Sequence, residues 1–299
     1  MPQVSIGMPV FNDKKFLQKA VDSLLSQTFS DFELIISDDC SSDGSAEICL
    51  AYAAHDSRIR YIRQHSNIGI SKNMKFLLNE AKGKYFMWAA NDDIWHGEFL
   101  ETLIRGFDNR PDMIVAFCPV RFIDEKERQI ENVPDRYTDY SGTTSLVRLN
   151  KLINIFDDAF GYGLFRREMI MEVEFPTWWW VNRTCAYNNI YPTLCYYLTK
   201  GDYILMGKQP LWFNRLKEEA NINHKVPYGN TYLRGTLAFC LRKFNLFWIS
   251  CRQIRRGGGS AGLLIRILPG IFYKWFLKPS LINFKVQTRQ YRMGNLKFL

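Results

Sequence analysis

Short β-rich runs alternate with helix-like stretches through residues 1–120, and this alternation constrains the fold more than any other feature of the chain. Strands are expected at 4–9, 33–37, 58–64, 84–89 and 113–118. The first intervening helix carries an apolar face made of Phe16, Leu17, Ala20, Val21, Leu24 and Leu25. Strand–helix–strand order of this kind is typical of a parallel sheet covered by helices. The sequence therefore predicts an α/β fold, Rossmann-like, with a mostly parallel central sheet and flanking helices.

Polar side chains follow four of these strands at the points where the strands end. They are Asn12-Asp13, Asp38-Asp39, Asn67 and Asp92-Asp93. Ligands of open α/β sheets bind in the crevice beyond the carboxyl ends of the strands, so these residues are candidates for a site. For a single Asp or Asn at such a junction, a helix cap or a turn is the commoner explanation, but four such junctions together favour a site. Two pairs of adjacent carboxylates on one sheet edge repel one another, which predicts a cation or hydrogen-bond donors in the crevice.

The net charge of +9 is concentrated near the C-terminus. After Glu219 there is no acidic residue, whereas 14 bases are interleaved with 13 aromatic residues. Helix-like stretches at 231–256 and 260–278 place Leu, Ile, Phe and Trp beside Arg and Lys, as interfacial helices do. We expect 220–299 to be a basic amphipathic helical extension on an anionic membrane surface. The alternative is that these helices pack on the protein's own domain and the bases are a solvated face, although such a face normally mixes both signs.

Other classes of partner and compartment are less favoured by the sequence. No recognised nucleic-acid-binding motif accompanies the basic residues, so no nucleic-acid partner is expected. The seven cysteines are scattered without metal-ligand spacing, and the first residues lack the pattern of a secretion signal. No stretch offers the ~20 uninterrupted apolar residues of a spanning helix. We therefore expect a cytoplasmic protein that is peripheral on the inner face of the cell membrane.

Several motifs occur in an order that is characteristic of one enzyme family. Residues 4–45 read VSIGMPVFNDKKFLQKAVDSLLSQTFSDFELIISDDCSSDGS, and NIGISKNM, GKYFMWAANDDIW, GYGLFRRE and KGDYILMGKQPLWFNR follow at 67–74, 83–95, 161–168 and 200–215. Over residues 3–215 the chain resembles family 2 glycosyltransferases of the GT-A fold, of the bacterial surface-polysaccharide type. The resemblance implies a GT-A domain at 1–219, with a nucleotide-sugar half at 1–120 and an acceptor half at 121–219.

The resemblance implies roles for the residues at the strand ends. Phe11 offers an aromatic face for a uracil ring, and Asp39 is similar to the residue that accepts a hydrogen bond from the base. The imide N–H of uracil or thymine suits a carboxylate, so a UDP-sugar is favoured and a dTDP-sugar is the alternative. Asp93 would bind the Mg²⁺ or Mn²⁺ that neutralises the diphosphate leaving group. The nucleotide-binding candidates are Pro9, Phe11, Asn12, Asp38, Asp39, Asn67, Gly69, Asn73 and Asp92.

The chain departs from the family pattern at the metal and at the catalytic base. Ala90 stands where many relatives carry an Asp, so weak metal binding is expected without nucleotide. The family's R-x-H motif reads Arg215-Leu216-Lys217. Inverting members usually place an Asp that acts as the general base where this chain has Asn188 and Asn189. An Asn side chain cannot take the proton of the acceptor hydroxyl. The alternative candidates for the base are Asp157, Asp158 and Glu174.

The acceptor side has its own candidates, Gly161 and the run Trp178-Trp179-Trp180, although burial of these rings under the C-terminal helices explains them equally well. Residues 121–150 are highly charged and poorly periodic, which predicts a strand followed by a surface loop.

The resemblance implies metal-assisted transfer, with inversion, to a hydroxyl of a lipid-linked or growing surface glycan. The missing Asp keeps two alternatives open: a lipid-phosphate acceptor that needs no base, or a non-catalytic nucleotide-sugar-binding partner protein at the membrane.

Overall fold

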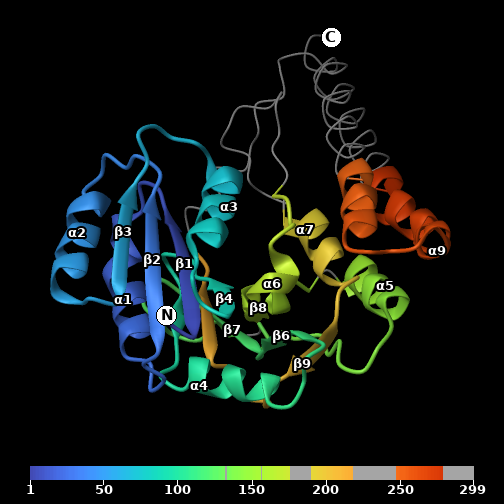
Figure 1. Cartoon of the computed structure of the whole chain (residues 1–299), viewed down its shortest axis with the longest axis horizontal. Helices are drawn as coiled ribbons and strands as arrows, with labels where there is room; N and C mark the ends of the chain where they lie inside the picture. Colours follow the sequence, from blue (N-terminus) through green and yellow to red (C-terminus); the bar gives the residue numbers. More distant parts are fainter. Residues whose placement is uncertain (132, 156, 176–189, 218–246, 279–299) are drawn as a thin grey trace, which may run out of the picture.

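A seven-stranded sheet forms the centre of the molecule, with strand order β3-β2-β1-β4-β8-β6-β9 (Figure 1). The computed structural model describes residues 1–131, 133–155, 157–175, 190–217 and 247–278. The strands are β1 (Val4–Val10), β2 (Phe32–Asp38), β3 (Ile59–Arg63), β4 (Tyr85–Trp88), β6 (Met113–Phe117), β8 (Leu164–Arg166) and β9 (Asp202–Leu205). Strand β8 runs antiparallel to both neighbours, and the other pairings are parallel. The predicted mostly parallel sheet is therefore confirmed, with one inserted antiparallel strand.

Helices cover both faces of this sheet (Figure 1). The helices are α1 (Lys14–Leu25), α2 (Ser45–His55), α3 (Ile70–Glu80), α4 (Phe99–Ile104), α5 (Ser145–Ile155), α6 (Arg167–Ile170), α7 (Ile190–Tyr197) and α9 (Ala261–Ile271). The apolar stripe of α1 packs with Val4, Ile6 and Met8 of β1 in one buried cluster. Leu77 and Leu78 of α3 belong to a second cluster. The alternation of side chains along the strands thus separates two cores, one on each face.

A smaller sheet joins distant parts of the chain. Its strand order is β5 (Ile94–Trp95), β10 (Trp212–Arg215) and β7 (Val120–Ile123), in which β10 is antiparallel to β5 and parallel to β7. Trp212 pairs with Trp95, so the end of the second half of the domain lies directly beside the loop that follows β4. This pairing decides which side chains meet at the carboxyl ends of the central strands.

The second half of the chain contains more helix than its sequence pattern predicted. Strand β7 was expected, but α5 begins at Ser145 inside the segment predicted as loop. Leu149, Leu152 and Ile153 of α5 are buried in the same cluster as Ile267 and Ile271 of α9. The charged residues before α5 hide this short apolar stripe from a pattern search. The helix is therefore stabilised by a tertiary contact that the sequence does not reveal.

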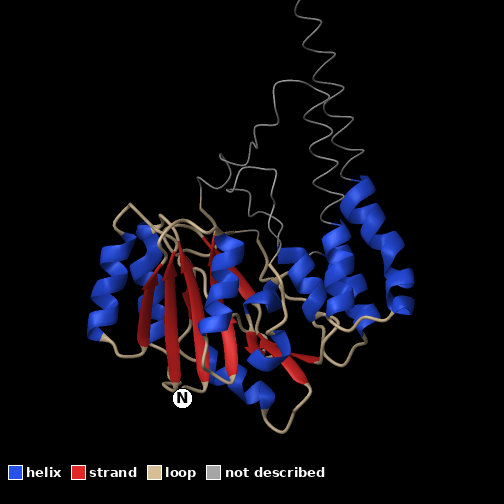
Figure 2. Cartoon of the chain, turned by 45° about the horizontal axis from the view of Figure 1, so that its top comes forward, coloured by secondary structure: helices blue, strands red, loops and turns tan. Residues whose placement is uncertain are grey.

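The C-terminal segment is helical where the structure describes it. Residues 247–256 and α9 are helices, and the Ser260 side chain accepts a hydrogen bond from the backbone N–H of Leu263 at the start of α9. Figure 2 shows these helices standing side by side with α5 at one end of the sheet. Among the described helices, none has both the length and the apolar character to cross a bilayer.

Gly163 holds the turn before β8 close to the sheet. A Cβ at this position would lie 2.6 Å from the carbonyl oxygen of Ala116 and 2.8 Å from the Cβ of Phe117. We expect Gly163→Ala to lower the free energy of unfolding by about 1–3 kcal/mol, because backbone must move to relieve the overlap. Gly262→Ala is the control, since its Cβ meets only Ser260 Oγ at 3.8 Å in a helix. Urea unfolding measures both, and equal midpoints would contradict the prediction.

Candidate active site

The carboxyl ends of β1, β2 and β4 meet at one edge of the sheet, where most of the predicted site residues lie. The backbone N–H of Asp39 donates to the carbonyl of Val10 at 2.8 Å, which ties the end of β2 to the end of β1. Asp92 and Asp93 follow β4, and the end of β10 reaches the same place from the small sheet. Topology therefore brings together the acidic pairs that the sequence placed at strand ends.

The first acidic pair is occupied by donors of the protein itself. Asp38 is buried, and its two oxygens accept hydrogen bonds from the Ser41 N–H at 2.8 Å and the Tyr61 hydroxyl at 2.9 Å. Asp39 is 3% exposed and accepts the N–H groups of Ile68 at 2.7 Å and Gly69 at 2.9 Å. Asp39 thereby fixes the loop before α3, whose turn at Gly69 has a φ of +83°.

The other residues predicted to bind nucleotide divide into buried and accessible ones. Asn73 is buried and donates to the carbonyl of Ser37 at 2.9 Å, so it anchors α3 to β2. Asn12 has a φ of +47°, and its side-chain oxygen accepts the Ser42 N–H at 2.8 Å. Pro9 and Asn67 are half-buried. Phe11 is 47% exposed, which makes it the large aromatic side chain presented to solvent at the end of β1.

Asp93 is completely buried and binds to β10. Its Oδ2 accepts the indole N–H of Trp212 at 2.8 Å, and its Oδ1 accepts the backbone N–H of Arg215 at 2.9 Å. The Asn214 amide lies 3.1 Å from both oxygens. Burial, together with the negative charge of Asp92, raises the pKa of Asp93, and these hydrogen bonds oppose the rise. The carboxylate expected to hold a metal is instead surrounded by donors from the far end of the domain.

Asp92 points to a different neighbour. The Lys217 ammonium lies 2.9 Å from Asp92 Oδ2 and also donates to Asp13 Oδ2, so one cation bridges two carboxylates. Burial acts to lower the pKa of Lys217, but the charges of Asp92 and Asp13 outweigh it and raise the pKa. For Asp13, burial raises the pKa and Lys217 opposes the rise. Asp13 and Lys217 have no role that the sequence pattern predicts, although they lie in the segments Asn12-Asp13 and Arg215-Leu216-Lys217.

The candidate bases lie in the acceptor half. Asp158 accepts an ion-paired hydrogen bond from Arg136 at 2.8 Å, and burial raises its pKa while Arg136 opposes the rise. Asp157 is buried with one oxygen bonded to the Ala159 N–H at 3.0 Å and the other without a protein partner. Gly161 is buried in the short helix Ala159–Tyr162 that follows.

That short helix connects the candidate bases to the acidic edge. The ring of Tyr162 stacks on the indole of Trp212 with centroids 4.4 Å apart, and Trp212 in turn donates to Asp93. Glu174 lies elsewhere and forms ion pairs with Arg252 and Arg256 of the C-terminal segment. Asn188, Asn189 and Trp178-Trp179-Trp180 lie outside the described residues.

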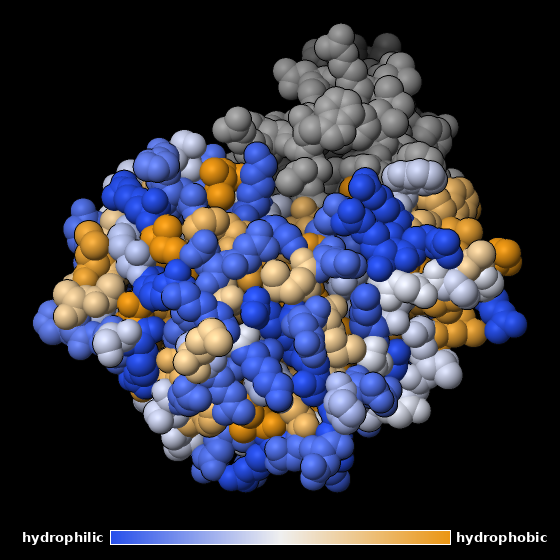
Figure 3. Space-filling view, viewed as in Figure 1, coloured by the Kyte–Doolittle hydropathy of each residue, from blue (hydrophilic) through white to orange (hydrophobic). Residues whose placement is uncertain are grey.

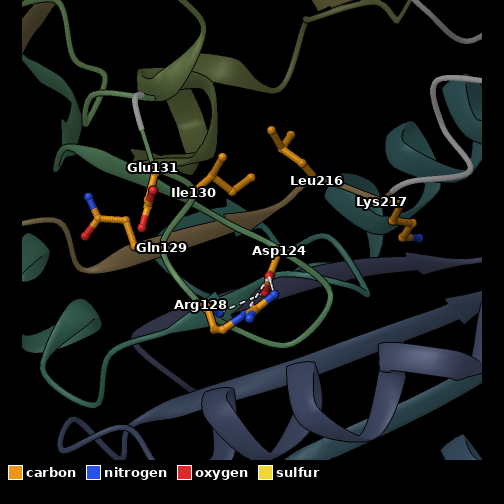
Figure 4. Close-up of a pocket in the computed structure, with 7 residues that line it drawn as sticks. All are labelled: Asp124, Arg128, Gln129, Ile130, Glu131, Leu216 and Lys217. Atoms are coloured by element: carbon orange, nitrogen blue, oxygen red, sulfur yellow. Dashed lines mark hydrogen bonds and ion pairs between the residues drawn. The ribbon is translucent and has the colours of Figure 1, made fainter.

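A pocket of about 590 Å³ opens beside Lys217 (Figure 4). Its lining residues are Asp124, Arg128, Gln129, Ile130, Glu131, Leu216 and Lys217. Figure 4 shows Asp124 and Arg128 paired along one wall, while Gln129 and Glu131 lie along another. The pocket therefore presents amide and carboxylate groups, which suit the hydroxyl groups of a sugar.

Comparison with known proteins now adds the family. Residues 5–174, more than half of the chain, match the profile of Glycosyl transferase family 2. The chain belongs to glycosyl transferase family 2. This finding confirms the resemblance that the motifs carried.

Known proteins resemble this chain in structure over most of its length, but their sequence identity to it is low. A GalNAc(5)-diNAcBac-PP-undecaprenol beta-1,3-glucosyltransferase of Campylobacter jejuni is 25% identical over 206 residues, which cover 67% of this chain and 63% of that protein. Other curated relatives are 30–35% identical to this chain over the aligned residues, and the chain covers about half of their length or less. The solved structure of S. aureus TarS 1-349 in complex with UDP-GlcNAc aligns with a TM-score of 0.61 at 15% identity, over 98% of this chain and 92% of that one. This structural likeness establishes the GT-A fold.

Members of this fold typically use a divalent cation. A mannosyltransferase from Pyrobaculum calidifontis, solved in complex with GDP-Man and Mn²⁺, aligns with a TM-score of 0.50 at 11% identity over 96% of this chain and 84% of that one. In the part of this chain that the structure describes, no group of three or more His, Cys, Asp or Glu side chains is arranged to hold a metal ion.

Asp93 and Asp92 are expected to differ in their effect on stability. Asp93→Ala leaves the Trp212 indole, the Asn214 amide and the Arg215 N–H buried without their acceptor. We expect it to lower the free energy of unfolding by about 3–5 kcal/mol. Asp92→Asn is the matched control, because Asp92 is partly exposed and an amide keeps its shape. We expect a cost of at most about 1 kcal/mol for that change. Similar urea midpoints for the two variants would contradict a structural role of Asp93.

Proposed function

We propose that the chain is a glycosyltransferase that moves a sugar from a UDP-sugar to a hydroxyl of a lipid-linked or growing surface glycan, with inversion. One observation carries the proposal: the accessible ring of Phe11 and the Asp13–Lys217–Asp92 cluster occupy the same edge of a GT-A sheet. A base-stacking ring next to a cation is what a nucleoside diphosphate requires. Membership of glycosyl transferase family 2 supports this reading.

The donor is proposed as a UDP-sugar, with a dTDP-sugar as the alternative. The solved TarS complex with UDP-GlcNAc has the same fold, which supports uridine, although its 15% identity does not carry the sugar over. The pocket beside Lys217 lies next to the cluster and offers polar groups for the sugar ring. Further nucleotide contacts are proposed at Pro9 and Asn12, which are close to Phe11 in the sequence. Asp39 would have to give up one of its bonds to the backbone N–H groups of Ile68 and Gly69 to accept a hydrogen bond from the base.

The acceptor is proposed to approach from the side of Asp157 and Asp158. Asp158 is the better candidate for the general base, because its carboxylate is partly exposed and burial raises its pKa above the ordinary value of an Asp. Glu174 is less suited, since its carboxylate is paired with two arginines. The Campylobacter jejuni relative, whose name gives an undecaprenol-linked glycan, supports a lipid-linked acceptor.

Removal of the Phe11 ring should weaken nucleotide binding. Stacking of a base on an aromatic side chain contributes about 1–3 kcal/mol, so Phe11→Ala should raise the Kd for UDP by about 5- to 100-fold. Phe11→Tyr keeps the ring and should bind as the parent does. Trp248→Ala, which removes an exposed ring far along the chain, is the control. Calorimetric titration with UDP measures all four proteins, and equal affinities would remove Phe11 from the site.

The reaction itself is tested by release of UDP from UDP-glucose, UDP-galactose, UDP-GlcNAc and UDP-GalNAc with undecaprenyl-diphosphate-linked acceptors. We expect acceptor-dependent release, and a loss of about 100-fold or more in kcat for Asp158→Asn, which matches the usual contribution of a general base. Binding of UDP without turnover on any acceptor would instead support the rival function, a non-catalytic nucleotide-sugar-binding protein. Transfer to a lipid phosphate by an Asp158→Asn variant at full rate would support the lipid-phosphate alternative.

The C-terminal segment is proposed to bind an anionic membrane surface. The inner face of α9 packs on α5 through Ile267 and Ile271, as the domain-packing alternative predicted. Ile265 of α9, Trp248 of the helix before it, and Phe272 and Tyr273 directly after it are exposed. Figure 3 shows apolar surface at the end of the molecule formed by α9, beside strongly hydrophilic residues. Residues 247–278 contain six Arg and Lys and no acid, which favours anionic lipid as the occupant.

A double variant, Trp248→Ala with Tyr273→Ala, should weaken this binding, because each ring buries apolar area in the interface. We expect at least about a fivefold loss of partitioning into phosphatidylglycerol-containing vesicles. Leu50→Ala, an exposed apolar residue on α2, is the control. Sedimentation with vesicles measures the partitioning. Equal partitioning of the double variant and its parent would contradict the proposal.

A further inference from the structure

The Lys217 ammonium lies between Asp13 and Asp92, at the sheet edge where the crowded carboxylates predicted a cation. It bridges Asp13 and Asp92, and its side chain is only 25% exposed. The ring of Phe16 lies 5.8 Å from Nζ and covers one side of the lysine. An ammonium has three N–H donors, and the two carboxylates use two of them. Among the residues that the structure describes, these two carboxylates are the ion-pair partners of Lys217, which leaves one donor for an oxygen of a bound diphosphate.

The backbone fixes Lys217 at this point. The Leu216 N–H donates to the carbonyl of Ile123 at 2.9 Å, which continues the pairing of β10 with β7. One residue earlier, the Arg215 guanidinium donates to the carbonyl of Asp92 at 2.8 Å, and the Arg215 N–H donates to Asp93. The two carboxylates that follow β4 are thus both held by residues 212–217. The backbone position of Lys217 is therefore fixed by β-sheet pairing and by the contacts of Arg215, unlike that of a lysine on a free surface loop.

The donor set at this edge does not fit a divalent ion. Mg²⁺ and Mn²⁺ prefer about six oxygen ligands, with few replaced by nitrogen. Asp93 is saturated by Trp212, Asn214 and Arg215, and Ala90 supplies no ligand. Asp13 and Asp92 each direct one oxygen to Lys217. Asp13 and Asp92 are therefore the carboxylates that remain for a divalent ion, and both are paired with the Lys217 ammonium. A divalent ion would have to displace this ammonium, whose positive charge repels it.

We infer that Lys217 replaces the divalent cation, so that this enzyme binds its nucleotide-sugar and transfers the sugar without a metal ion. The inference rests on the proposed function. During transfer, the bond between C1 of the sugar and the β-phosphate oxygen breaks, and its electron pair remains on that oxygen. The acceptor oxygen forms the new bond to C1, and its proton passes to the general base. Lys217 stabilises the negative charge that develops on the departing UDP.

Titration of the metal-stripped full-length protein with UDP tests this inference. The Kd should change by less than about twofold between EDTA, Mg²⁺ and Mn²⁺ buffers, since the cation is already supplied by the chain. Lys217→Met should raise the Kd by at least about tenfold in EDTA, because a charge-assisted contact to phosphate contributes about 1.5–3 kcal/mol. Lys217→Arg should retain most of the affinity, and Lys208→Met, a change of an exposed lysine, is the matched control.

A second measurement on Lys217→Met separates a local effect from a loss of the fold. Removal of the ammonium leaves Asp13 and Asp92 uncompensated. We therefore expect Mn²⁺ to restore UDP affinity to this variant and to raise its Tm, although it does neither for the parent protein. UDP binding by the parent only in the presence of Mg²⁺ or Mn²⁺ would overturn the inference and leave the proposed function intact. Absence of UDP binding in every buffer would overturn both.

Discussion

Crowding of carboxylates at one sheet edge is the constraint on which the rest of this structure depends. Parallel strands deliver Asp13, Asp38, Asp39, Asp92 and Asp93 to the same end of the sheet. Such charges must find donors or counter-charges before the chain can become compact. Each of the five finds a partner within the protein. The polarity of the site is thus a product of folding, and a nucleotide bound there as proposed would meet a preorganised surface.

The partners come from far along the sequence, which links the site to the completeness of the domain. Trp212, Arg215 and Lys217 lie more than a hundred residues after Asp92 and Asp93, and β10 brings them there by pairing with β5 and β7. The stacked Tyr162 and Trp212 rings extend the same contact toward the candidate bases. The proposed donor side and the proposed acceptor side therefore share β10 as a structural element. A change in β10 should affect both nucleotide binding and transfer.

Much of the nucleotide-binding half could be predicted from the sequence, because its information is local. Hydrophobic periodicity located the strands and helices up to β6, and parallel topology implied that their polar ends converge. Neither argument distinguishes Asp92 from Asp93. The hydrogen-bond donors of β10, which is distant in the sequence, determine that Asp93 is the buried one. Likewise, Lys217 was visible only as a departure from R-x-H. Its partners Asp13 and Asp92 appear only in three dimensions.

In the second half, the sequence pattern predicts α7, β9 and β10, but two other elements resisted prediction for a related reason. Strand β8 is three residues long and antiparallel, and α5 follows a charged segment, so both depend on tertiary contacts that local patterns do not record. The resemblance to family 2 glycosyltransferases supplied the fold there, but it also carried an expectation about the metal. The chemistry of this chain's own residues points to a different solution at that position, in which a lysine stands in for the ion.

A crystal structure of the chain grown with both UDP and Mn²⁺ would show whether Lys217 or a metal ion contacts the diphosphate. The account predicts that Nζ of Lys217 contacts a diphosphate oxygen at about 3 Å while it still contacts Asp92, with the uracil ring against Phe11. It also predicts that Asp93 keeps its hydrogen bonds to β10. An Mn²⁺ ion coordinated by Asp92 or Asp93 and by the diphosphate, with the lysine turned away, would contradict the account.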